Sequence, residues 1–271
     1  MKRVLEKALE ENDLLLASLL VTQHLGMDRP LSTYLAIIER WQRRAQQRVD
    51  QSAPLHQQVT QLNQFFYTEL AFAGQPKNLL APDYARMDQV MLYRNGCSVC
   101  LSILYCHLAR AIGLDATGVS CPGHFFVSVP INEQQSVLLD ALSGESVTWE
   151  ELERRYHGFE DSDQTLALDD LIVAPANSHT TLVRLLHNLK QAYVGQEQYQ
   201  SALMVSDLLV SLNPEDPYER KGRGWLLQQL NCYAGALADY RYYIRTCPQD
   251  PASHLLKLQL RNHNPRTEVL H

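Results

Sequence analysis

Three of the six cysteines lie within ten residues of one another, in the stretch "RNGCSVCLSILYC" at positions 94–106. The first of them, Cys97, follows an Asn-Gly turn signal and stands at the start of an apolar helical pattern. The unpaired backbone N–H groups at a helix start favour negative charge, and the thiolate is the nucleophilic form of cysteine. Cys97 is therefore the first candidate nucleophile of the chain.

A nucleophilic thiol also needs a base and a group that orients the base. His124 begins the apolar segment "HFFVSVP", and Asp140 ends the segment "SVLLD". The order Cys, His, Asp on a helix and two strands predicts a triad of Cys97, His124 and Asp140. In this triad Cys97 attacks a carbonyl carbon, His124 transfers the proton, Asp140 orients the imidazole, and a backbone N–H near the helix start stabilises the oxyanion.

Two other interpretations of these residues remain open. The pairs Cys97-x2-Cys100 and Cys121-x2-His124, with 20 residues between them, have the spacing of paired zinc knuckles and predict a structural zinc site. Cys100 and Cys106 also fall within the apolar helical pattern, where cysteine acts as a small buried hydrophobe. On that last interpretation the stretch begins a buried helix, and the site is structural or vestigial.

The elements that must position these side chains follow from periodicity. Helical spacing dominates residues 1 to about 75, and it returns from Ser98 to Ile112, with Gly113 as a natural stop. Between 116 and 142 the pattern changes to short segments rich in β-branched and aromatic residues, which predict a sheet of about three strands. We therefore expect an α+β domain over residues 1–155 with a helical N-terminal subdomain.

An internal repeat follows an acidic connector at 156–180. Tyr199 and Tyr233, Ala202 and Ala236, and Pro214 and Pro248 are each 34 residues apart, which is the tetratricopeptide period. This spacing predicts all-α repeats over 181–271, with units at about 183–216 and 217–250 and a capping helix from Pro251. Because about three units are needed to bury a continuous core, we expect the array to depend on the domain before it.

Composition excludes several classes of function. A net charge of −6 and a pI near 5.9 provide no basic surface for nucleic acid. The apolar run "LLLASLLV" at 14–21 follows acidic residues and is far shorter than the roughly 20 residues that span a bilayer, so we expect neither a secretion signal nor a membrane anchor. A cytoplasmic protein with reduced thiols is therefore expected. No Walker loop, Rossmann fingerprint, GxSxG elbow or HExxH motif is present, and we expect no cofactor.

The chain resembles the transglutaminase-like fold. That fold combines a Gly-x-Cys at a helix start, an aliphatic helix ending in Arg-x-x-Gly, a strand that opens with His and a strand that ends in Asp. The matching stretches here are Gly96-Cys97-Ser98, Arg110-Ala111-Ile112-Gly113, His124-Phe125-Phe126-Val127 and Leu139-Asp140.

Over nearly its whole length the chain also resembles the bacterial SirB-type family, in which such a domain precedes tetratricopeptide repeats. The stretches that carry this resemblance are "LNQFFYTELAF" at 62–72, "RNGCSVCLSILY" at 94–105, "PGHFFVSV" at 122–129, "LLDALSGE" at 138–145 and "NPEDPYERKGRG" at 213–224.

The resemblance implies a thiol acyl-transfer site that is displaced in this chain. Counted back from Arg110, the nucleophile position falls on Ser98, one residue after Cys97, and one residue rotates a helical position by about 100°. The resemblance also implies that the catalytic residues are often lost in this family. We therefore expect an interaction or regulatory protein whose degenerate cleft and repeat array bind a protein segment. The alternative is a transferase or protease-like enzyme that uses Cys97, His124 and Asp140.

Overall fold

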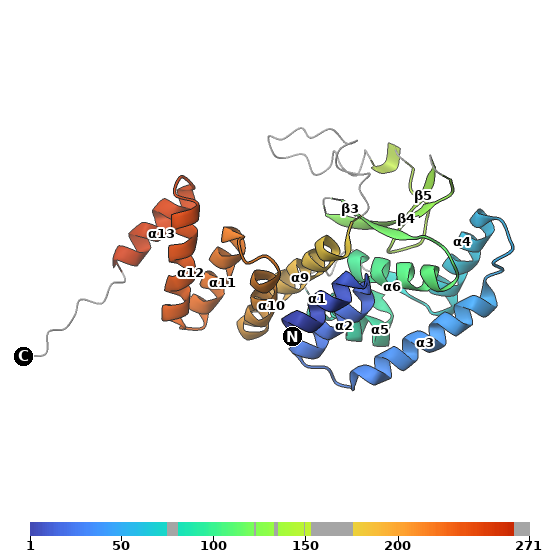
Figure 1. The fold of residues 1–271 in the computed structure, drawn as a ribbon, viewed down its shortest axis with the longest axis horizontal. Coiled ribbons are helices and arrows are strands. Elements are labelled where there is room, and N and C mark those ends of the chain that lie inside the picture. The colour runs from blue at the N-terminus through green and yellow to red at the C-terminus, as the bar shows by residue number, and fades with distance from the viewer. Residues whose placement is uncertain (75–80, 122, 133–134, 149, 153–175, 263–271) are drawn as a thin grey trace, which may run out of the picture. The chain divides into compact units, whose positions relative to one another are not determined.

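The computed structural model describes residues 1–74, 81–121, 123–132, 135–148, 150–152 and 176–262. These residues form two compact units, one made chiefly of Arg3–Ala192 and the other of Tyr193–His271. The first unit combines helices with a small antiparallel sheet, and the second is helical, so the predicted α+β class is confirmed (Figure 1). Most of the connector expected at 156–180 lies outside the described residues.

Helices make up the first part of the first unit. In chain order they are α1 (Lys2–Glu10), α2 (Leu14–Leu25), α3 (Leu31–Arg48), α4 (Leu55–Asn63), the π-helix η1 (Gln64–Glu69), the short η2 (Pro82–Tyr84) and α5 (Met87–Tyr93). The run "LLLASLLV" lies in α2, which begins where Asp13 accepts a hydrogen bond from the Leu16 N–H, and most of this helix is buried. No helix within the described residues is both long and apolar enough to cross a membrane.

One face of α3, which follows Pro30, is buried. Tyr34, Ile38 and Trp41 of α3 are buried, whereas Leu35 is 36% exposed. Leu35 is adjacent to Tyr34 in sequence, so it lies about 100° away around the helix and at the edge of the buried stripe.

The Asn-Gly turn expected before the cysteines is not where the chain turns. Asn95–Gly96 forms the short strand β2, which pairs in parallel with β1 (Ala73–Gly74), and Arg94 takes the left-handed conformation with φ of 60°. A Cβ on Gly96 would lie 2.8 Å from a methyl group of Val90. Glycine is therefore needed at 96 because the strand passes close to α5, and not because of a turn.

Helix α6 (Ser98–Ala111) is the centre of the first unit. Ten of its 14 residues are buried. It packs against the sheet on one side and against α2 and α3 on the other (Figure 1). The helix ends before Gly113, which has φ of 85°, as expected.

The expected three-stranded sheet is present and has the order β3-β4-β5. It consists of β3 (Thr117–Cys121), β4 (His124–Pro130) and β5 (Ser136–Asp140), all antiparallel. The register pairs Cys121 with His124 and Phe126 with Asp140. His124 and Phe126 are two positions apart on the same strand, so the side chains of His124 and Asp140 lie on the same face of the sheet as diagonal neighbours.

Helix α9 (Ser178–Gly195) precedes the paired helices of the repeat region. These helices are α10 (Tyr199–Leu212), α11 (Pro217–Gln229), α12 (Tyr233–Thr246) and α13 (Pro251–Asn262). Ala202 and Ala236 are buried, as the 34-residue repeat predicts for sites where helices approach closely. Gly224 of α11 has the same role, because a Cβ there would lie 2.9 Å from the ring of Tyr240 on α12.

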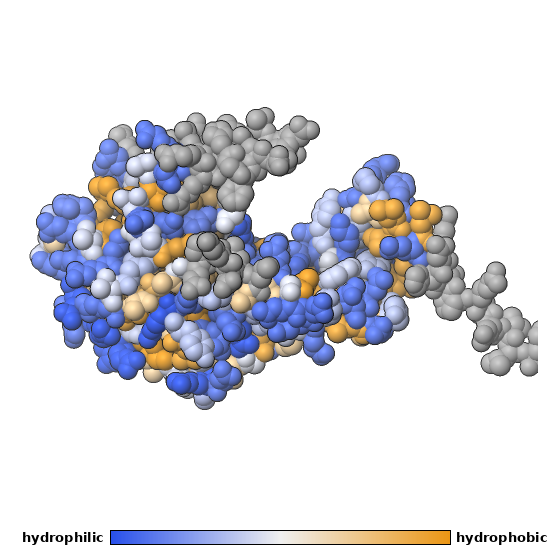
Figure 2. Space-filling view, turned by 180° about the vertical axis from the view of Figure 1, so that it is seen from behind, coloured by the Kyte–Doolittle hydropathy of each residue, from blue (hydrophilic) through white to orange (hydrophobic). Residues whose placement is uncertain are grey.

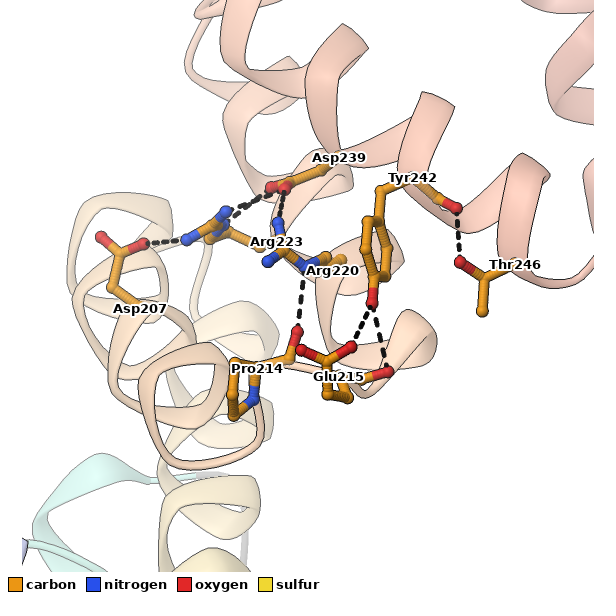
Figure 3. Close-up of polar contacts among 8 residues, drawn as sticks. All are labelled: Asp207, Pro214, Glu215, Arg220, Arg223, Asp239, Tyr242 and Thr246. Atoms are coloured by element: carbon orange, nitrogen blue, oxygen red, sulfur yellow. Dashed lines mark hydrogen bonds and ion pairs between the residues drawn. The ribbon is translucent and has the colours of Figure 1, made fainter.

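Charged side chains connect three helices of the second unit (Figure 3). Arg223 of α11 donates two hydrogen bonds to Asp239 of α12, at 2.7 and 2.8 Å, and one to Asp207 of α10, at 3.1 Å. Arg220 lies 3.7 Å from the same Asp239 carboxylate, and its guanidinium covers the ring of Tyr242. Only 2% of Asp239 is exposed, so a buried carboxylate holds the two arginines of α11 in place.

Candidate functional site

Cys97 occupies the position immediately before α6. Its backbone is extended, with φ of −72° and ψ of 160°, and its N–H donates to the Tyr84 carbonyl oxygen at 2.7 Å. Only 4% of the residue is exposed. The sequence prediction that Cys97 stands at a helix start is therefore met, but the sulfur lies below the surface.

The surroundings of Cys97 favour its thiolate. The thiol of Cys100, one turn into α6, donates to the Cys97 sulfur and is the largest cause of a pKa below the usual range. Burial acts in the opposite direction, because it disfavours charge. No regular cap hydrogen bond forms, yet the backbone N–H groups of Cys100 and Val99 still contribute to the lowered pKa.

The amide of Asn188 is a further donor to Cys97, with its Nδ2 3.9 Å from the sulfur. Asn188 lies on α9, 91 residues further along the chain. Sequence reasoning did not find this residue, because an asparagine on a helix carries no local signal of a distant thiol. In the cysteine proteases an amide helps to orient the site, but here the amide contacts the sulfur itself.

His124 and Asp140 form the second part of the site. His124 Nε2 lies 2.9 Å from Asp140 Oδ1. An ionised carboxylate only accepts hydrogen bonds, so Nε2 carries the proton and Nδ1 is left as the basic nitrogen. The Leu142 N–H also donates to Asp140 Oδ1 at 2.9 Å, and the ring of Phe126 packs against the imidazole with centroids 4.6 Å apart. The predicted pairing of base and orienting carboxylate is therefore present in the geometry.

A hydrogen-bond network holds the turn that follows Asp140. Tyr67 donates to the Ala141 carbonyl at 3.0 Å, and Asn63 donates to the Gly144 carbonyl at 2.8 Å. Asn63 in turn accepts from the Tyr105 hydroxyl at 2.7 Å. Burial and the nearby Asp140 charge raise the pKa of Tyr67, so it remains a neutral donor. These residues act on the site through the backbone that carries Asp140, and their roles could not be derived from sequence spacing.

The structure brings the predicted triad together only in part. Within the described residues, the hydrogen bonds of the Cys97 side chain go to Cys100 and Asn188, and that of the His124 ring goes to Asp140. No hydrogen bond joins Cys97 to His124 in this part of the chain.

The four residues of the zinc interpretation do not gather around one point. Cys97, Cys100, Cys121 and His124 all lie within the described residues, and no group of three or more potential ligands in that part of the chain is arranged to hold a metal ion. Burial raises the pKa of Cys121 to about 11, so this thiol is protonated in the metal-free chain.

A pocket of about 600 Å³ lies against the second half of α6. Its polar lining includes Ser102, His107, Arg110 and His179. His107 Nε2 lies 2.9 Å from the side-chain nitrogen of Gln42, and burial lowers its pKa, so it is neutral at neutral pH and accepts from that amide. Neither Cys97 nor His124 lines this pocket, so it is separate from the predicted triad.

Comparison with known proteins shows the family of the chain. The profile of the transglutaminase-like superfamily matches residues 32–187, and that of the tetratricopeptide repeat matches residues 189–261. A UPF0162 protein of Vibrio cholerae is 34% identical over 195 residues, which cover 72% of each chain. The UPF0162 protein YchA of Escherichia coli K12 and the protein SirB1 of Salmonella typhimurium are each 28% identical over 93% of both chains. No solved structure matches the chain with statistical significance.

Proposed function

This chain belongs to the transglutaminase-like superfamily and to the UPF0162/SirB1 family within it, and on that premise we propose that it is a protein-interaction protein whose repeat unit binds a helical segment of a partner protein. Membership supplies a fold, and the function must be argued from a site. We also propose a cytoplasmic location, since all six cysteines are free thiols, as in a reducing compartment.

The observation that carries the proposal is the exposed apolar face of α13. Leu255 is 63% exposed and Leu258 is 56% exposed, and residues three apart share a helix face. Figure 2 shows a hydrophobic patch on the surface of this helix. Patches of this kind mark sites of interaction when nothing in the same chain covers them.

The repeat explains what covers such a face elsewhere. Counting back 34 residues places Leu255 at Lys221 and Leu258 at Gly224, both on α11. In α11 these positions contact the next helix, α12: Lys221 Nζ lies 3.3 Å from the Tyr243 hydroxyl, and Gly224 lies against the Tyr240 ring. The leucines of α13 therefore stand where a following helix packs in the preceding unit. The occupant we propose is an amphipathic helix with an apolar or aromatic face, comparable to α12.

Site-specific crosslinking tests this proposal. A photo-crosslinking amino acid is placed at 258 and, as a matched control, at Tyr93, which is 72% exposed in the first unit. In extracts of the source cells we expect a protein adduct from position 258 that maps to an apolar helical segment and is lost when Leu255 is also changed to Ser. Burying the two leucines contributes about 2 to 4 kcal/mol, so Leu255→Ser with Leu258→Ser weakens purified complex at least 30-fold. Equal adducts from Tyr93, or adducts with a second copy of this chain, would overturn the proposal.

Thiol acyl transfer is the second candidate, and the His124–Asp140 pair with the lowered pKa of Cys97 favours it. In this reaction the Cys97 thiolate forms a bond to the carbonyl carbon of an amide, His124 gives a proton to the leaving amine, and the C–N bond breaks to leave a thioester. An amine or water then releases the acyl group. Incorporation of a fluorescent primary amine into a glutamine-containing protein, abolished by Cys97→Ala and by His124→Ala but not by Cys121→Ala, supports it. Absence of incorporation by the reduced full chain contradicts it.

A further inference from the structure

Cys97 and Cys100 form a Cys-x-x-Cys pair at the start of α6. Cys97 precedes the helix, and Cys100 lies in its first turn. The Cys100 sulfur is 3.5 Å from the Ala85 carbonyl oxygen, and its single S–H proton is shared between that oxygen and the Cys97 sulfur. Both thiols are free. Two adjacent thiols at a helix start are the arrangement of dithiol redox sites, in which the first cysteine is the more acidic.

The two thiols differ in the way that a redox pair requires. The pKa of Cys97 is lowered, chiefly by the donated hydrogen bond, and that of Cys100 is raised, chiefly by burial. A thiolate reacts with an oxidant, whereas a protonated thiol does not. Cys97 is therefore the thiol that is attacked first, and Cys100 is the neighbour in position to close a disulfide. Neither proposed function uses the Cys100 thiol for chemistry.

We propose that Cys97 and Cys100 are an oxidation site at which hydrogen peroxide drives formation of an intramolecular disulfide. The Cys97 thiolate attacks one peroxide oxygen, the O–O bond breaks, and Cys97 becomes a sulfenic acid with release of hydroxide. The Cys100 sulfur then attacks the Cys97 sulfur, the S–OH bond breaks, and the S–S bond forms. The Cys100 proton leaves with the second hydroxide as water. The two thiols are oxidised together by two electrons, and one peroxide molecule is reduced to two molecules of water.

Backbone geometry allows the bond to close at small cost. Side chains three positions apart on a helix have Cβ atoms about 5 to 6 Å apart, and a disulfide needs about 3.5 to 4.5 Å. The backbone of Cys97 is extended and lies outside the regular helix, although its carbonyl oxygen accepts from the Leu101 N–H at 3.1 Å, so the adjustment must fall on the Cys97 side chain and on the peptide before it. Oxidation also removes the thiolate that accepts from Asn188, so the bond between α9 and the start of α6 weakens.

Burial determines which oxidant reaches the pair. Cys97 is 4% exposed and Cys100 is fully buried. Peroxide is far smaller than glutathione disulfide, and thiol–disulfide exchange requires access to the attacking sulfur, so burial hinders the larger oxidant more. We therefore expect peroxide to oxidise the pair at least tenfold faster than glutathione disulfide does at equal concentration.

Mass spectrometry of the full chain tests the proposal. The reduced protein is treated with peroxide, its remaining thiols are alkylated under denaturing conditions, and disulfides are mapped. Trypsin leaves Cys97, Cys100 and Cys106 in one peptide, so Cys106→Ala is the matched variant in which the bond must still form. We expect the loss of two hydrogens and two unalkylated cysteines at 97 and 100, reversed by dithiothreitol. In Cys100→Ala the disulfide cannot close, and at a pH high enough to ionise Cys97 we expect a sulfenic acid at this residue that dimedone traps.

The possible outcomes separate clearly. Six alkylated thiols after peroxide, or a disulfide that uses Cys106 or Cys121, would overturn the proposal. The mapping is carried out on the wild-type chain, so a variant that fails to fold does not decide it. The oxidation proposal does not depend on the proposed binding of a partner through α13. We expect the double variant Leu255→Ser with Leu258→Ser to form the disulfide as the wild type does, so each proposal can fail without the other.

Discussion

Replacing the donors around Cys97 tests whether the start of α6 holds a thiolate. A hydrogen bond to a charged group contributes about 1.5 to 3 kcal/mol, and one pKa unit corresponds to about 1.4 kcal/mol. The Cys100 thiol is the largest cause of the lowered Cys97 pKa. Because that thiol is the largest cause, Cys100→Ala raises the pKa of Cys97 more than replacement of any other side-chain donor around the sulfur. The buried sulfur then has fewer donors to offset its desolvation.

Asn188→Ala is the smaller perturbation of the same thiol. Its amide nitrogen is 3.9 Å from the sulfur, which is long for a donor, and we assign it about 0.5 to 1 kcal/mol. The expected rise in the Cys97 pKa is therefore smaller than the rise in Cys100→Ala. Cys232→Ala, at an exposed cysteine of the second unit, is the control and leaves the Cys97 pKa unchanged.

Ultraviolet absorbance of the thiolate measures these shifts in a buried group. Each variant is titrated with pH beside the same variant carrying Cys97→Ala, and the difference isolates the Cys97 thiolate. The order of effects is the decisive result. If Asn188→Ala raises the pKa as much as Cys100→Ala does, or if neither variant raises it, the account of the site given above is wrong.

Three further changes act on stability. Asp239→Ala removes the buried carboxylate that holds two partly exposed arginines and costs about 2 to 3 kcal/mol in urea unfolding. Asp207→Ala, at a side chain 55% exposed, costs about 1 kcal/mol or less. Burial raises the pKa of the Cys106 thiol from its ordinary 9.0 to about 12. The stability that comes from burying the neutral thiol is therefore fully present below pH 9 and is lost as pH rises toward 12. At about pH 10.5 we expect urea unfolding to show a loss of about 2 kcal/mol relative to neutral pH, and Cys106→Ala should remove this loss. Gly144→Ala adds a Cβ at a residue whose φ is 76°, and this Cβ would lie 2.3 Å from the Tyr67 ring. We therefore expect thermal unfolding to show a loss of stability of about 2 kcal/mol or more. An unchanged unfolding midpoint would contradict the close approach of Gly144 to Tyr67.

Periodicity made most of the fold predictable. The helix from Ser98, the three short strands and the 34-residue repeat each follow from patterns that repeat over a few residues or at a fixed interval, and such patterns record burial directly. The pairing of His124 with Asp140 was predictable for the same reason. Once two adjacent antiparallel strands are assigned, residues at the start of one and the end of the other are neighbours.

Contacts that join distant segments could not be predicted. Asn188 meets Cys97 only because α9 packs near α6, and a single sequence contains no record of that packing. The "RNG" stretch shows a related difficulty. Asn-Gly is a strong turn signal, yet Arg94 takes the left-handed conformation and Gly96 serves close packing against Val90. Turn-forming residues indicate the position of a bend to within a residue or two, and tertiary packing decides which residue takes the left-handed conformation.

The partners of Cys97 distinguish the two kinds of chemistry open to it. Its sulfur contacts a thiol and an amide, both donors, and neither group can take up and return a proton during acyl transfer. Oxidation by peroxide needs a stabilised thiolate and a nearby second thiol, and the start of α6 provides both. Acyl transfer also needs His124 to approach the sulfur, because the leaving amine must be protonated.

His124→Ala therefore separates the two reactions. We expect this variant to lose any amine incorporation and to form the disulfide between Cys97 and Cys100 at the wild-type rate under peroxide. Asp140→Asn should behave in the same way, because Asp140 acts on Cys97 only through the imidazole. If either variant slows the oxidation by tenfold or more, His124 reaches Cys97 in solution, and the separation between them described above does not represent the working site.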